Sequence, residues 1–128
     1  MRARMFKPRF APMVKSGAKR QTVRPIPKRY PNVGDIESWR EWSGKPYRSK
    51  QRELARVEIV GVYPISLTFR NGLDHVRLSP SKIGLLPQAI EDFARADGFT
   101  SAGEMFEWFN ATHGLPFKGI LIVAKDAQ

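Results

Sequence analysis

The 128-residue sequence contains no cysteine and only two histidines, His75 and His113. A chain without cysteine has no disulfide framework, no thiolate zinc site and no thiol nucleophile. With two isolated histidines, a metal centre would have to be built mostly from carboxylates. We therefore expect neither a bound metal nor another cofactor.

Long hydrophobic runs are also absent. The longest, ILIVA at 120–124, is much shorter than the roughly 20 apolar residues that a membrane-spanning helix needs. The basic N-terminus lacks the continuous apolar segment of a secretion signal. These features predict a cytosolic protein without membrane contact. The length and the 41% hydrophobic content suit one compact domain over residues 1–128, and they do not indicate an oligomeric state.

Acidic residues are missing from the first 34 positions. Residues 1–52 carry a net charge of +12, whereas residues 53–128 carry −2. A positive field concentrated in one half of a chain attracts anions, and phosphate contacts supply most sequence-independent affinity for nucleic acids. The alternative is a basic surface that only keeps the protein in solution.

Periodicity and turn signals predict a succession of strands with a few helices. The expected strands lie at 2–6, 20–24, 36–42, 54–69, 74–78 and 117–125, and the expected helices at 9–15, 87–96 and between Ser101 and Gly114. Gly17 suits the end of the first helix, and residues 44–52 form a basic loop. This order predicts an α+β fold with a small curved sheet or barrel and helices on its flank.

Several local patterns refine this prediction. In the 54–69 segment, one face of the strand carries Val57, Ile59, Tyr63, Ile65 and Leu67, with a bend at Gly61 or Pro64. Asn71-Gly72 is typical of a hairpin turn. Ser101 followed by Glu104 forms a capping box, and Met105, Trp108 and Phe109 then repeat at the spacing of a core-facing helix.

One motif carries a family resemblance. Gly17, Lys19, Thr22 and Arg24 form G-x-K-x-x-T-x-R, followed by VGD at 33–35 and ADGFTSAGEMFEWF at 96–109. In this order the segments resemble the ASCH domain family, over residues 6–123. The resemblance implies a PUA-like β-barrel flanked by helices that binds RNA or a nucleotide in a cleft beside the barrel.

The same resemblance implies a set of catalytic residues. Some small bacterial ASCH proteins are amidohydrolases that remove the acetyl group from N4-acetylcytidine with a lysine, a threonine and a glutamate. The corresponding positions here are Lys19, Thr22 and Asp97, and Asp97 is one methylene shorter than the family's glutamate.

The chemistry of these residues sets its own conditions. A threonine hydroxyl needs a base to take its proton, and lysine serves only when burial or nearby positive charge lowers its pKa. Lys19 can face Thr22 only if it lies in the turn before the strand, because residues three apart on a strand point to opposite faces. The alternatives are an exposed lysine and a simple strand former. Asp97 is in phase with Ile90 and Phe93, which predicts partial burial, but it can instead cap the Asp97-Gly98 turn.

Aromatic and basic residues form a second cluster, made of Trp39, Arg40, Trp42, Lys45, Tyr47, Arg48 and Lys50. Aromatic rings between cations can stack unpaired bases while the cations contact phosphates. Trp39 and Trp42 are three residues apart, so we expect one of them in the core. Tyr47, in the loop, is the better stacking candidate.

The sequence therefore favours an ASCH domain that binds RNA or a nucleotide in a basic cleft. The predicted contact residues are Lys19, Arg20, Arg24, Lys28, Arg29, Lys45, Tyr47, Arg48 and Lys50. The planar guanidinium group of Arg24 would bind a phosphate or carboxylate through two parallel hydrogen bonds. One alternative is a hydrolase of a modified nucleoside, or a weak ribonuclease, that uses Lys19, Thr22 and Asp97. The other is a protein-interaction module whose basic face docks an acidic partner.

Overall fold

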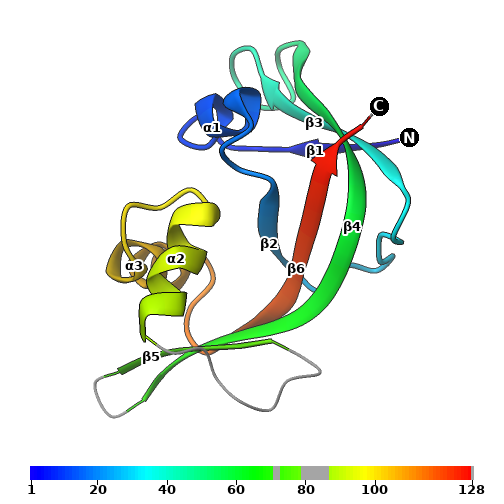
Figure 1. The fold of residues 1–128 in the computed structure, drawn as a ribbon. Helices are drawn as coiled ribbons and strands as arrows, with labels where there is room; N and C mark the ends of the chain where they lie inside the picture. The colour runs from blue at the N-terminus through cyan, green and yellow to red at the C-terminus, as the bar shows by residue number, and fades with distance from the viewer. Residues whose placement is uncertain (71–72, 79–86, 128) are drawn as a thin grey trace.

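The computed structural model describes residues 1–70, 73–78 and 87–127, and it has the predicted α+β composition (Figure 1). Its elements are β1 (Arg2–Met5), α1 (Ala11–Ser16), β2 (Gln21–Pro25), β3 (Ile36–Trp42), β4 (Gln51–Arg70), β5 (Leu73–Leu78), α2 (Pro87–Ala96), α3 (Ala102–Thr112) and β6 (Phe117–Asp126). The predicted strands and helices are confirmed, with ends that differ by a few residues. The turn predicted at Asn71-Gly72 lies outside the described residues. None of the described helices is long and apolar enough to cross a membrane.

The 20-residue strand β4 organises the sheet, whose order is β1-β3-β4-β6-β2, with β5 also paired to β4. The first part of β4 pairs with β3, its later part with β6, and its last residues with β5, all antiparallel. Figure 1 shows β4 curving along the whole sheet. The register opposite β6 shifts between Ile59 and Gly61, which makes Val60 an extra residue. Such a β-bulge bends a strand and increases its twist, and it lies next to the predicted bend at Gly61.

One side-chain prediction in β4 is wrong. Tyr63, expected on the buried face, is 40% exposed. Ile65 and Leu67, which were predicted on the same face as Tyr63, are buried. The Tyr63 ring lies over the backbone of Gly61, where a Cβ atom would come within 2.6 Å of the ring. The glycine therefore makes room for this ring position.

The strands β1 and β2 are the edges of the sheet. β1 pairs parallel with β3, and β2 pairs antiparallel with β6. In the described part of the chain no backbone ladder joins β1 to β2, so the sheet is open and the predicted barrel is not confirmed. A side chain bridges the two edges instead, because Arg24 Nη2 on β2 donates a 2.8 Å hydrogen bond to the carbonyl oxygen of Met5 on β1.

The core lies between the sheet and the helices, which Figure 1 shows on the concave side of the sheet. The inward residues predicted for α2, Ile90, Phe93 and Ala94, are buried. The α3 cap is also confirmed, since the Ser101 hydroxyl oxygen accepts a 3.1 Å hydrogen bond from the Glu104 N–H. The Glu104 carboxylate accepts from the Thr100 N–H and pairs with Arg9.

Candidate functional site

A cavity of about 190 Å³ brings together residues that are far apart in the sequence. Four of its lining residues are the predicted polar ones, Lys19, Thr22, Arg24 and Asp97. Aromatic rings form much of the wall. The remaining lining residues are Met5, Phe6, Lys7, Phe10, Val23, Pro25, Phe99, Trp108, Phe109, Thr112 and His113. Lys19, Thr22 and Asp97 therefore converge on one cavity.

Lys19 lies in the turn between α1 and β2, as the predicted pairing with Thr22 required. Gly17 ends α1 with a left-handed φ of 93°, and its N–H donates to the Val14 carbonyl oxygen. The Lys19 side chain is only 3% exposed. Its Nζ donates a 2.5 Å hydrogen bond to the Asp97 backbone oxygen and lies 3.4 Å from the carboxylate Oδ1. The ammonium group also lies 5.0 Å from the Phe10 ring centroid, within cation–π range.

Asp97 follows α2 directly, and its side chain is buried beside Lys19. Gln21 Nε2 donates to the same Oδ1 atom at 3.4 Å. The next residue, Gly98, has a φ of 102°, and a Cβ atom there would lie 2.9 Å from Phe10 and 3.3 Å from Lys19 Cδ. Gly98 thus permits both the turn and the close approach of Lys19.

Burial disfavours the charged forms of both Lys19 and Asp97, because each loses its hydration. It lowers the pKa of Lys19, and the hydrogen bond and charge of Asp97 oppose this shift while the Arg24 charge adds to it. Burial likewise raises the pKa of Asp97, opposed first by the charge of Lys19. An amine with a lowered pKa is available as a base at a lower pH than an exposed lysine.

Thr22 and Arg24 point to the same side of β2 because they are two residues apart. Arg24 Nε donates a 3.0 Å hydrogen bond to Thr22 Oγ1, which leaves the buried hydroxyl free to donate its own proton elsewhere. Arg24 lies 4.7 Å from the Phe6 ring centroid. Burial, followed by the charge of Arg4, lowers the pKa of Arg24 to about 10, so Arg24 remains charged at pH 7. Nε and one N–H of Nη2 are engaged in these hydrogen bonds, which leaves the two Nη1 hydrogens and the second Nη2 hydrogen for a ligand.

The other predicted contact residues do not line this cavity. Arg20 donates to Asp126 and to the Val14 and Lys19 carbonyl oxygens, so the fold uses its guanidinium group. Lys28 and Arg29 are exposed in the segment between β2 and β3.

The loop between β3 and β4 carries the predicted aromatic and basic cluster. Tyr47 is 89% exposed, and its ring lies 5.1 Å from that of Trp42. Lys45, Arg48 and Lys50 are exposed around it. Trp39 is fully buried, which confirms that one of the two tryptophans faces the core.

Sequence reasoning did not identify the residues of the cavity wall, among them Trp108, His113 and Lys7. Trp108, expected in the core, is only partly buried and lines the cavity. His113 follows α3 and lies 5.9 Å from the Trp108 ring and 5.0 Å from Phe117. Burial, followed by the charge of Lys7, lowers the pKa of His113. Lys7 Nζ itself lies 5.1 Å from the Trp108 centroid. No local pattern marks Lys7 or His113, because only tertiary packing places them here.

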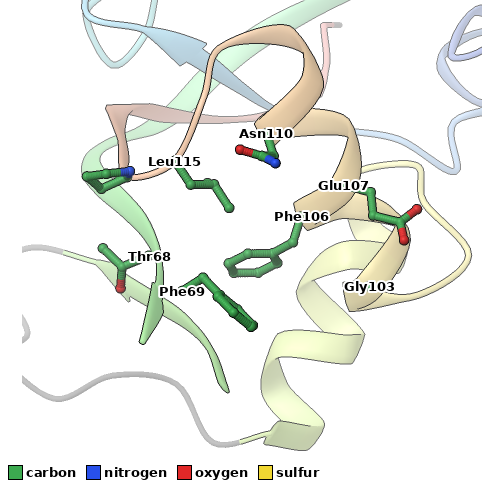
Figure 2. Close-up of a pocket in the computed structure, with 8 residues that line it drawn as sticks. Thr68, Phe69, Gly103, Phe106, Glu107, Asn110 and Leu115 are labelled. Carbon is green, nitrogen blue, oxygen red and sulfur yellow. The ribbon is translucent and has the colours of Figure 1, made fainter. Parts of the chain in front are cut away.

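A second hollow, of about 560 Å³, lies on another side of α3 (Figure 2). The rings of Phe69 and Phe106 and the side chain of Leu115 extend into it, and Glu107 and Asn110 lie along α3 beside it. It is larger than the first cavity, but its described lining residues include no ion pair. We therefore take the smaller cavity as the candidate site.

Among the described residues, no group of three or more histidines and carboxylates is placed to hold a metal ion. Comparison of the chain with protein-family models, curated proteins and solved structures gives no significant match.

Proposed function

We propose that the chain is an ASCH-like domain that binds RNA or a nucleotide, with one base in the cavity around Lys19, Thr22 and Arg24. The observation that carries this proposal is the convergence of the three motif residues and Asp97 on one aromatic-walled cavity. Its volume of about 190 Å³ is below the range of about 300 to 1,000 Å³ for drug-sized ligands, so it suits a single ring system. The curved sheet with its bridged edges is compatible with the PUA-like barrel that the resemblance implies.

The exposed loop supports a role for flanking nucleotides. Tyr47 and Trp42 offer a ring surface, and Lys45, Arg48 and Lys50 surround it with positive charge. Aromatic platforms within basic surfaces bind single strands with little sequence preference. The loop would hold the strand while the cavity accepts one base.

Amide hydrolysis is the second candidate, and the buried Lys19–Asp97 pair beside Thr22 favours it. In this reaction neutral Lys19 takes the Thr22 proton while Oγ1 attacks the acetyl carbonyl carbon of N4-acetylcytidine. Collapse of the tetrahedral intermediate breaks the carbon–nitrogen bond, and the Lys19 ammonium returns the proton to the leaving amine. Water then hydrolyses the acetyl-threonine ester to acetate. Asp97 orients Lys19 throughout.

Titration of the folded protein with ribonucleosides, ribonucleotides and short oligoribonucleotides at low salt tests the binding proposal. We expect binding that weakens in Lys19→Met and Thr22→Val and is retained in the exposed control Lys118→Gln. Absence of binding by the wild-type chain would contradict the proposal and leave docking of an acidic protein as the surviving alternative.

Release of acetate from N4-acetylcytidine tests hydrolysis separately. Lys19→Met and Thr22→Val should each remove most turnover, and the double variant should be scarcely worse, because members of one catalytic unit are strongly non-additive. Asp97→Glu, which restores the family's longer carboxylate, should retain or raise turnover. Nucleoside binding without acetate release would eliminate the hydrolase and leave the binder.

A further inference from the structure

The charges that line the candidate cavity do not balance. Its charged residues are Lys7, Lys19, Arg24 and Asp97. Lys19 and Asp97 contribute no net charge together, whether the shared proton lies on the amine or on the carboxyl group. Burial, followed by the charge of Lys7, lowers the pKa of His113, which favours its neutral form. Among the described lining residues, two positive charges, on Lys7 and Arg24, therefore remain without a counter-charge.

These two cations differ in what they can still bind. Arg24 is partly buried, and both of its assigned hydrogen bonds go to uncharged oxygens, Thr22 Oγ1 and Met5 O. Glu37, a nearby carboxylate, is held by Arg4 through bonds of 2.7 and 2.8 Å. Lys7 is exposed and, in the described ranges, has no carboxylate within 4.0 Å. Its ammonium group keeps its hydrogen-bond donors for a ligand.

The position of Lys7 fixes where an anion would sit. The ammonium lies 5.1 Å from the centroid of Trp108, a partly buried residue, whereas Lys19 and Asp97 lie in the buried part of the same lining. An anionic group loses less hydration free energy at a partly exposed position, where it keeps part of its water shell. A flat ring gains more packing energy between aromatic side chains in the buried part. The ligand should therefore be polar and negative at the Lys7 end and flat at the Lys19 end.

We infer that the cavity takes a nucleotide whose phosphate is bound by Lys7 and whose base lies inside, so that a phosphorylated nucleoside is preferred over the free nucleoside. This inference rests on the proposed nucleotide-binding function and adds the charge of its ligand. Lys7 is then a specificity-determining residue outside the G-x-K-x-x-T-x-R motif, and Arg24 supplies long-range attraction from within.

The experiment compares the four ribonucleosides with their own 5′-monophosphates by calorimetric titration at low salt. For at least one base, the monophosphate should bind at least about tenfold more tightly, as expected for one charge-assisted hydrogen bond. Lys7→Gln should weaken monophosphate binding much more than nucleoside binding, and so remove most of this ratio. Lys15→Gln, an exposed lysine of α1 outside the cavity lining, is the matched control and should keep the ratio.

The outcomes separate this inference from the function on which it rests. Nucleosides that bind as tightly as their monophosphates, or a ratio unchanged by Lys7→Gln, would overturn the preference for a phosphate and leave base binding intact. If the wild-type protein binds neither the nucleosides nor the monophosphates, both the nucleotide-binding function and the phosphate preference are overturned. Titration with a short oligoribonucleotide identifies the source of the phosphate. If the oligoribonucleotide binds more tightly than the monophosphate and its binding depends on Lys7, the bound phosphate belongs to an RNA strand. If the monophosphate binds more tightly, the ligand is a free nucleotide.

Discussion

Arg24 on β2 and Met5 on β1 are joined across the open side of the sheet by a 2.8 Å hydrogen bond from Nη2 to the backbone oxygen. The same guanidinium holds Thr22 Oγ1 through Nε. One side chain therefore links the two edge strands and fixes the hydroxyl that faces the cavity.

Arg24→Lys should destabilise the protein, because lysine keeps the charge but cannot make both hydrogen bonds. We expect a loss of about 1.5 to 3 kcal/mol in the free energy of unfolding, the range for hydrogen bonds to charged groups. Urea denaturation measures it. The exposed Arg29→Lys is the control and should change stability by less than about 0.5 kcal/mol. Equal, small effects of both variants would show that the bridge contributes nothing to stability.

Lys19 and Asp97 should be strongly coupled. Lys19→Met leaves a buried carboxyl without its partner, and Asp97→Asn leaves a buried amine, so each should cost about 3 to 5 kcal/mol. The double variant should cost clearly less than the sum of the two. The exposed pair Arg9 and Glu104 is the matched control, with a coupling of at most about 1 kcal/mol. Additive losses at the buried pair would refute the coupling.

Gly98 and Gly34 separate backbone strain from steric crowding. Both have a positive φ, 102° and 96°, but a Cβ atom would meet Phe10 and Lys19 at Gly98 and nothing within 4 Å at Gly34. Gly34→Ala should cost about 1 kcal/mol from strain alone. Gly98→Ala should cost more and should also weaken nucleotide binding, because it displaces Lys19. Thermal melts and titrations compare the two, and equal melting temperatures with equal affinities would contradict the crowding.

Glu37 should make stability sensitive to acid. Burial alone would raise the pKa of Glu37, but the hydrogen bonds and charge of Arg4, with a hydrogen bond from Trp39, hold it below its usual 4.5. A carboxyl group with a depressed pKa stabilises the folded state above pH 4.5, and this stabilisation is lost as the pH falls through the folded pKa. Glu37→Gln should therefore lower stability at pH 7 and flatten its loss in acid. Denaturation at several pH values tests this, with exposed Glu107→Gln as control. A slope unchanged in Glu37→Gln would argue against the role.

Tyr47→Ala should reduce single-stranded RNA binding without affecting the fold. The expected loss is about 1 to 3 kcal/mol of binding free energy, the cost of removing one stacked base. Phe109, which is 1% exposed, is the contrasting position, where Phe109→Ala should cost about 3 to 5 kcal/mol of stability. Unchanged RNA affinity in Tyr47→Ala would remove the loop from the proposed interface.

Local signals in the sequence predicted the elements well. The capping box at Ser101 and the terminal glycine at Gly17 each depend on neighbours within a few residues. The bulge at Val60 could not be located from local signals, because it depends on pairing with β6, which is distant in the sequence. The same limit applies to closure of the sheet, since sequence periodicity contains no information on whether two edge strands meet.

The polar residues of the candidate site could be predicted from the sequence, but its aromatic wall could not. Lys19, Thr22 and Asp97 were selected through the family resemblance together with the spacing and polarity of the motif, and the structure places them on one cavity. The aromatic wall and Lys7 were not found, because Phe10, Trp108 and Lys7 come together only after α1 and α3 pack. The bonds from Arg20 to Asp126 and from Arg24 to Met5 were also not predicted, because their partners are distant in the sequence.

The pairing of β2 has a consequence for the order of folding. Its ladder partner in the sheet is β6, which lies almost 100 residues later in the chain, with Gln21 opposite Val123. Contacts between such distant segments carry a large loop-closure entropy and form late. During synthesis, β2 cannot take its place in the sheet before residues 117–126 leave the ribosome. The nascent chain therefore carries the motif residues unassembled until β6 has docked.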